Sequence, residues 1–135
     1  MKGTNMIEPI TVYAVSDMTG QTVSRVVRAA SAQFAPGHVR IKVLSNVVSA
    51  EQIIAFIQQS GDGHGTCAVF HTILSKRVRK DLRCALQTLR IPSHDLLGSC
   101  AHVMADLLGE RPQDTPGLTI DDGAIPEIFD LSQNA

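Results

Sequence analysis

The chain has 135 residues, of which 44% are hydrophobic and 19% are charged, a composition typical of a single soluble globular domain. No apolar run is long enough to span a membrane and no signal peptide is recognisable, so we expect a cytoplasmic protein without a membrane partner. The absence of Trp and the single Tyr leave few aromatic rings for stacking on bases, and we expect no nucleic-acid partner.

The formal net charge of −1 conceals an uneven distribution of charge along the chain. Residues 1–109 contain 11 basic and 7 acidic side chains, a net charge of +4. Residues 110–135 contain one basic and six acidic side chains, a net charge of −5. We therefore expect the basic body and the acidic tail either to contact each other or to bind different partners.

Four strands alternate with four helices in the predicted chain order. Runs rich in β-branched and apolar residues predict strands at Ile10–Ser16, Val39–Val47, Thr66–Leu74 and Ile91–Leu97. Apolar residues at helical spacing follow each strand, over Val23–Phe34, Ile53–Ile57, Val78–Leu89 and Cys100–Leu108.

This alternation predicts an α/β fold of three layers around a parallel four-stranded sheet. We expect a Rossmann-like or flavodoxin-like strand order near 2-1-3-4, with a crevice beside the first strand. Residues 1–9 lack periodicity and are expected to be a flexible lead-in, and residues 10–110 to form the α/β domain. Pro and Gly punctuate residues 111–135, which are expected to form an irregular acidic tail or linker.

Small polar residues and a Gly follow the first predicted strand, at the sheet edge where parallel α/β proteins usually bind ligands. Free backbone N–H groups at the start of the next helix favour an anion there. The alternative, in which Asp17 or Thr19 merely caps that helix, stays open. Polar residues at the ends of the second and third strands are expected at the same edge. The candidate anion-binding residues are Ser16, Asp17, Thr19, Gly20, Gln21, Thr22, Ser45 and Thr72.

Five basic residues crowd the start of the third predicted helix, with Asp81 the only acid among them. Cations at that end oppose the helix dipole, so they are not placed there for helix stability. They predict a docking patch for an acidic protein surface or a phosphate, and a solvated basic helix face is the alternative. The candidate docking residues are Lys76, Arg77, Arg79, Lys80 and Arg83.

The histidines and the three cysteines are scattered and match neither zinc-site spacing nor C-x-x-C. We therefore predict no metal site and no disulfide. His94 and Asp95 are adjacent near the end of the fourth predicted strand, but neighbours in a strand point to opposite sides. No catalytic residue is assigned.

Four short motifs are informative in combination. Residues 16–22 are Ser-Asp-Met-Thr-Gly-Gln-Thr, and residues 69–74 are Val-Phe-His-Thr-Ile-Leu. Ile91-Pro92 precedes Asp-Leu-Leu-Gly at 95–98, and Leu-Gly-Glu-Arg-Pro at 108–112 precedes Pro116-Gly117. In this order they resemble motifs of the bacterial and plastid regulatory proteins of pyruvate, phosphate dikinase, a family that includes the phosphoenolpyruvate synthetase regulatory proteins. The first motif departs from the family at Met18 and Gln21, where the family has Ser and Glu.

The resemblance implies an unusual bifunctional activity for complete family members. They phosphorylate a threonine of the dikinase or synthetase with ADP as the donor, and they remove that phosphate with inorganic phosphate, releasing pyrophosphate. The resemblance thus implies ADP or ATP and phosphate as ligands of the full-length proteins. It also implies pyruvate, phosphate dikinase or phosphoenolpyruvate synthetase as the partner, and it leaves a homodimer open.

The family's nucleotide-binding half carries a P-loop, and this chain contains no Gly-x-x-x-x-Gly-Lys-Ser/Thr. We therefore expect an N-terminal domain without catalysis or a cofactor of its own, which serves docking, dimerisation or anion binding. The alternative is a stand-alone small α/β module that binds a phosphorylated metabolite or nucleotide at the loop after the first strand. A third class is an interaction protein without a ligand.

Overall fold

The computed structural model describes residues 8–60, 65–114 and 127–132. Four parallel strands form one sheet in the order β2-β1-β3-β4, and the strands are β1 (Ile10–Val15), β2 (Val39–Leu44), β3 (Cys67–His71) and β4 (Ser93–Asp95). The helices are α1 (Gln21–Ser31), α2 (Ala50–Gln59), α3 (Lys76–Thr88) and α4 (Leu96–Leu108). The predicted α/β class and the order 2-1-3-4 are confirmed.

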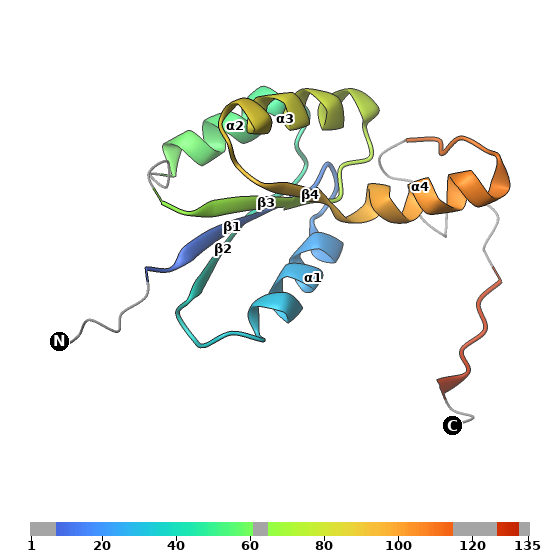
Figure 1. The fold of residues 1–135 in the computed structure, drawn as a ribbon, viewed down its shortest axis with the longest axis horizontal. Helices are drawn as coiled ribbons and strands as arrows, with labels where there is room; N and C mark the ends of the chain where they lie inside the picture. Colours follow the sequence, from blue (N-terminus) through green and yellow to red (C-terminus); the bar gives the residue numbers. More distant parts are fainter. Residues whose placement is uncertain (1–7, 61–64, 115–126, 133–135) are drawn as a thin grey trace.

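The sheet is covered on both faces (Figure 1). On one face, Tyr13 and Val69 pack in a cluster with buried residues of α2 and α3 such as Ile53 and Leu82. On the other face, Val12 and Ala14 pack against Val23 and Val27 of α1. The central strand β1 is therefore apolar on both sides, which is why its sequence lacks the alternation of a half-exposed strand.

The strand order places a crevice between the carboxyl ends of β1 and β3. The chain leaves β1 through α1 toward β2 and returns through α2 to β3 on the opposite side of β1. Such a switch point is where open α/β sheets usually bind ligands. Backbone hydrogen bonds hold the ends of the three strands together here. The Thr72 N–H after β3 donates to Val15 O of β1 at 3.1 Å, and the Ser16 N–H after β1 donates to Leu44 O of β2 at 3.0 Å.

Several predicted element ends are wrong. The second strand stops at Leu44 rather than Val47, because Asn46 adopts a φ of 56° and its N–H donates to Met18 O. The third strand stops at His71, and the fourth is only Ser93–Asp95. Helix α4 begins at Leu96 rather than Cys100, because the Asp95 side chain caps it. The prediction that the fourth strand extends through Leu96 and Leu97 is therefore wrong.

The predicted lead-in and tail fall largely outside the described residues. Residues 1–7 of the lead-in and residues 115–126 and 133–135 of the tail are not described. The described part of the tail lies beyond α4. None of the described helices combines the length and the hydropathy that a membrane span requires.

Helix α4 extends away from the sheet (Figure 1), and several of its apolar side chains are exposed. None of its residues is buried among the described residues. Val103 is 57% exposed, Met104 61%, Leu107 83% and Leu108 67%. An exposed apolar surface of this kind is typical of a helix that packs against another protein segment.

We predict that Gly98→Ala destabilises the domain. A Cβ at Gly98 would overlap the Asp95 carboxylate, whose Oδ1 accepts the Gly98 N–H at 2.7 Å. In an ordinary helix the same change stabilises by about 0.5–1 kcal/mol, whereas loss of an N-cap costs about 1 kcal/mol. Urea unfolding should show a lower unfolding free energy for Gly98→Ala and a near-unchanged one for Cys100→Ala on the same helix. A Gly98→Ala protein that is more stable than the parent contradicts this.

Candidate functional site

Asp17 joins the loop after β1 to the loop after β3 at the carboxyl edge of the sheet. Its Oδ2 accepts the N–H groups of Leu74 at 2.9 Å and Ser75 at 3.0 Å, across the crevice from its own loop. Its Oδ1 is buried and has no hydrogen-bond partner among the described residues. The alternative that Asp17 or Thr19 caps the first helix is wrong, because Gly20 holds the N-cap position without a side-chain cap.

The loop after β1 borders a cavity of about 210 Å³. Six of the eight candidate anion-binding residues line it, namely Ser16, Thr19, Gly20, Gln21, Thr22 and Thr72. Asp17 and Ser45 do not line it. The Ser16 hydroxyl accepts the Met18 N–H at 2.9 Å and is thus engaged in the turn itself.

Gly20 is required by the shape of this loop. Its φ of 85° is in the left-handed region, and a Cβ there would lie 3.4 Å from the Ser45 Cβ. The two strand-end residues expected near the loop are therefore close to it. Ser45 lies next to Gly20, and Thr72 lines the cavity. The N–H groups of Gln21 and Thr22 open α1, where they have no acceptor within the helix.

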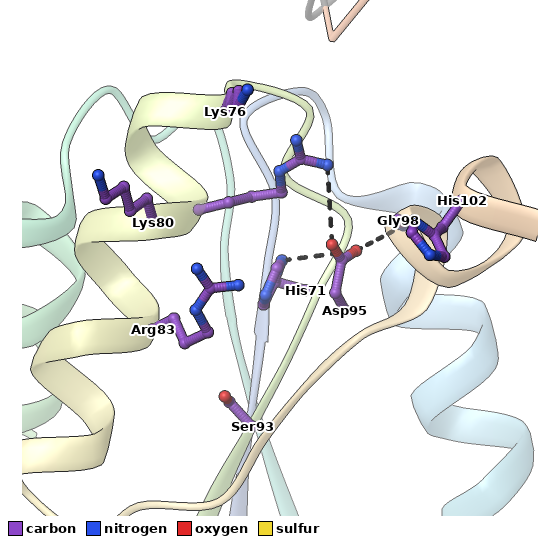
Figure 2. A pocket seen from close by; sticks show the side chains of 9 residues that line it. His71, Lys76, Lys80, Arg83, Ser93, Asp95, Gly98 and His102 are labelled. Atoms are coloured by element: carbon purple, nitrogen blue, oxygen red, sulfur yellow. Dashed lines mark hydrogen bonds and ion pairs between the residues drawn. The ribbon is translucent and has the colours of Figure 1, made fainter. Parts of the chain in front are cut away.

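A larger cavity of about 380 Å³ lies between α3, α4 and the ends of β3 and β4 (Figure 2). We call it the basic pocket. Its lining residues are His71, Lys76, Arg79, Lys80, Arg83, Ser93, Asp95, Gly98 and His102. Four of the five predicted docking residues therefore line one cavity, and only Arg77 does not.

Helical spacing explains why these four cations share a face. Positions 76, 79, 80 and 83 recur at intervals of three and four, while Val78, Leu82 and Leu86 on another face of α3 are buried against the sheet. Arg79 contacts two carboxylates, with Asp114 at 3.1 Å and Asp95 at 3.9 Å. No carboxylate in the described part of the chain lies within 4.0 Å of Lys76, Lys80 or Arg83.

His71 and Asp95 are brought together by strand register, which sequence analysis missed. They are direct partners in the β3–β4 pairing, and His71 Nδ1 lies 4.0 Å from Asp95 Oδ1. Sequence analysis paired Asp95 only with its neighbour His94. The signal that could have found the pair is that each residue ends a strand, and neighbouring parallel strands end at the same edge.

His71 is a buried, neutral imidazole. It is 6% exposed, and its Nδ1 accepts the Ile73 N–H at 3.3 Å, which leaves its proton on Nε2. Burial lowers the pKa of His71 below the ordinary value of 6.5, because it removes water from the charged form. Asp95 opposes this lowering of the pKa, and Arg79 adds to it.

We predict that stability falls as the pH is lowered through the ordinary His pKa of 6.5. Below that value the unfolded chain binds a proton that folded His71 excludes, so the unfolding free energy drops by up to about 1.4 kcal/mol per pH unit until the folded pKa is reached. His71→Asn keeps an acceptor for Ile73 but does not titrate, and it should flatten this dependence in urea unfolding between pH 5 and 8. His38→Asn is the control, because His38 lies at the amino end of β2, away from His71, and its replacement should leave the contribution of His71 in place. An unchanged slope in His71→Asn contradicts the assignment.

The chain is similar in sequence to several known proteins. It is 30% identical over 107 residues to a protein of Citrifermentans bemidjiense and 32% identical over 107 residues to one of Geobacter metallireducens. A Lysinibacillus sphaericus protein is 29% identical over 123 residues. All three are named as regulatory proteins of pyruvate, phosphate dikinase. The matches cover 79%, 79% and 87% of this chain but only 39%, 39% and 44% of the relatives.

The family comparison covers nearly the whole α/β unit, from Val12 within β1 onward. The sequence model of the family described as kinase/pyrophosphorylase matches residues 12–124, which include the loop after β1 and the entire basic pocket. The family resemblance found in the sequence motifs is thereby confirmed. The chain belongs to the kinase/pyrophosphorylase family.

Proposed function

We propose that this chain is the N-terminal domain of a regulatory protein of pyruvate, phosphate dikinase or phosphoenolpyruvate synthetase, and that its basic pocket docks the partner enzyme. The kinase and pyrophosphorylase activities, with ADP or ATP and phosphate as ligands, are proposed for the full-length regulator. Family membership and the names of the relatives support this assignment. The chain spans about 39% of the length of the first relatives, which fits one domain of a longer protein.

The observation that carries the docking proposal is the charge of the basic pocket. Lys76, Lys80 and Arg83 project from one face of α3 without a carboxylate partner in the described part of the chain (Figure 2). Cations in the first half of a helix oppose its dipole, so the cluster costs folding stability. An acidic surface on a partner offsets that repulsion and accelerates association.

Two further features support docking as part of a larger assembly. The Asp114 carboxylate lies 3.1 Å from an Arg79 nitrogen, which is the kind of contact that an acidic partner would make. The exposed apolar side chains of α4 offer a second surface for a neighbouring protein segment.

We predict that Arg83→Glu slows association with the partner enzyme about tenfold at low salt, because rim charges act mainly on the association rate. Arg77→Glu is the matched control, since Arg77 is exposed on the same helix but outside the basic pocket. Surface plasmon resonance with the dikinase and with the synthetase, at ionic strengths of about 0.02 and 0.2 M, measures both rates. The difference between the variants should shrink at the higher salt. Equal rates for Arg83→Glu and Arg77→Glu at low salt count against this docking site.

A second candidate function is anion binding at the loop after β1. It is favoured by the Gly20 N-cap, which leaves the first N–H groups of α1 without a side-chain acceptor, and by the Thr19, Thr22 and Thr72 residues that line the cavity of about 210 Å³. The ligand class is a phosphorylated metabolite or a nucleotide. None of the described residues that line this cavity is basic, so the affinity should be weak.

We predict that phosphate, pyrophosphate or ADP shifts the amide NMR signals of Gly20, Gln21 and Thr22 at about millimolar concentration. Gly20→Val should abolish the response, because a side chain there strains the left-handed backbone and crowds Ser45. Unchanged amide signals in α3 serve as the check that the variant is folded. The loop site is wrong if Gly20 to Thr22 stay still while signals elsewhere move, or if folded Gly20→Val responds fully.

A further inference from the structure

We propose that the basic pocket binds the phosphoryl group of a phosphate monoester. This deepens the docking proposal, because it names the chemical group that the pocket recognises, and it is testable without any partner enzyme. The inference concerns the cavity between α3, α4 and the ends of β3 and β4, and not the loop after β1.

Charge balance is the first argument. Four cationic side chains line the basic pocket, and the carboxylates of Asp95 and Asp114 both contact Arg79. Among the described residues, the excess is therefore two positive charges. A phosphate monoester carries about −1.5 to −2 at neutral pH and offers three acceptor oxygens, whereas a single carboxylate carries only −1. A dianion is therefore the better match for the pocket.

The arrangement of donors is the second argument. Figure 2 shows Lys80 and Arg83 of α3 on one side of the pocket, Gly98 and His102 of α4 on the other, and His71 between them. Arg79 is held by two carboxylates at 3.1 and 3.9 Å, so its guanidinium is ordered before a ligand arrives. An ordered guanidinium loses less freedom when it binds an oxyanion.

The size of the pocket defines the ligand further. A volume of about 380 Å³ exceeds what a phosphate ion needs and lies within the range of small-molecule sites, about 300–1,000 Å³. The pocket therefore has room for the group to which the phosphoryl is esterified. That group is either a small organic molecule or a phosphorylated side chain of a protein.

The Asp114 carboxylate would compete with a bound phosphoryl group for the Arg79 guanidinium. The carboxylate lies 3.1 Å from Arg79 Nη2 and belongs to the acidic segment that follows α4. A bound phosphoryl group would contact the same guanidinium and be repelled by this carboxylate. Removing the charge with Asp114→Asn should therefore strengthen binding.

The experiment titrates the full chain with three probes: glycerol phosphate, a phosphoserine peptide, and the same peptide with Glu in place of phosphoserine. Amide NMR signals of Ser93 and Gly98 report the pocket, and calorimetry gives the affinity. We expect both phosphate probes to bind at least about tenfold more tightly than the Glu peptide, because charge-assisted bonds to a dianion are stronger. Arg83→Gln should weaken phosphate binding about tenfold, Arg77→Gln should not, and Asp114→Asn should strengthen it about threefold.

The three probes distinguish a small phosphorylated molecule from a phosphorylated protein segment, and the variants show whether the basic pocket is the binding site. Equal affinity for the two phosphate probes assigns a small phosphorylated molecule, and tighter binding of the peptide assigns a phosphorylated protein segment. A Glu peptide that binds as tightly as the phosphoserine peptide overturns phosphate recognition. Amide shifts confined to Gly20–Thr22 also overturn the proposal, as does an equal loss of phosphate affinity in Arg83→Gln and Arg77→Gln. The docking proposal is judged separately, by the association rates with the partner enzyme.

Discussion

The rest of the site depends on the two hydrogen bonds that the Asp17 carboxylate accepts across the crevice. The carboxylate accepts two backbone N–H groups from the segment that enters α3, at 2.9 and 3.0 Å, and so joins the loop after β1 to the loop after β3. Hydrogen bonds to a charged group contribute about 1.5–3 kcal/mol each. The same two bonds hold the segment that leads into α3, where the Ser75 hydroxyl caps the helix by accepting the Val78 N–H at 3.3 Å. The two cavities at this edge thus share one anchor.

Asp95 joins several elements on the other side of the basic pocket, as Asp17 joins the two loops. It ends β4, caps α4 through the Gly98 N–H, and lies 3.9 Å from Arg79 and 4.0 Å from His71. One carboxylate therefore links a strand end, a helix start and the basic face of α3. It also restrains the positive charge of the pocket without cancelling it, since the other three lining cations of α3 have no carboxylate partner in the described part of the chain.

The structure shows what Met18 and Gln21, the two departures from the family motif, do in the loop after β1 and at the start of α1. Met18 contributes its backbone, because its N–H donates to the Ser16 hydroxyl and its carbonyl accepts the Asn46 N–H at 2.8 Å. Another side chain can occupy that position without loss of these bonds. Gln21 is the first residue of α1 and lines the smaller cavity, where a neutral amide repels an anion less than a carboxylate would.

The sequence by itself determined the fold class, the strand order and the clustering of cations on α3, because these follow from local periodicity and from the rules of parallel crossovers. It failed at the start of α4, where the Asp95 cap outcompeted an apolar Leu96-Leu97 pair that resembled strand. Only the tertiary structure decided that Asp17 bonds across the crevice, that His71 meets Asp95, and that Arg77 lies outside the basic pocket. Each of these depends on the register and packing of elements distant in sequence, which local patterns do not encode.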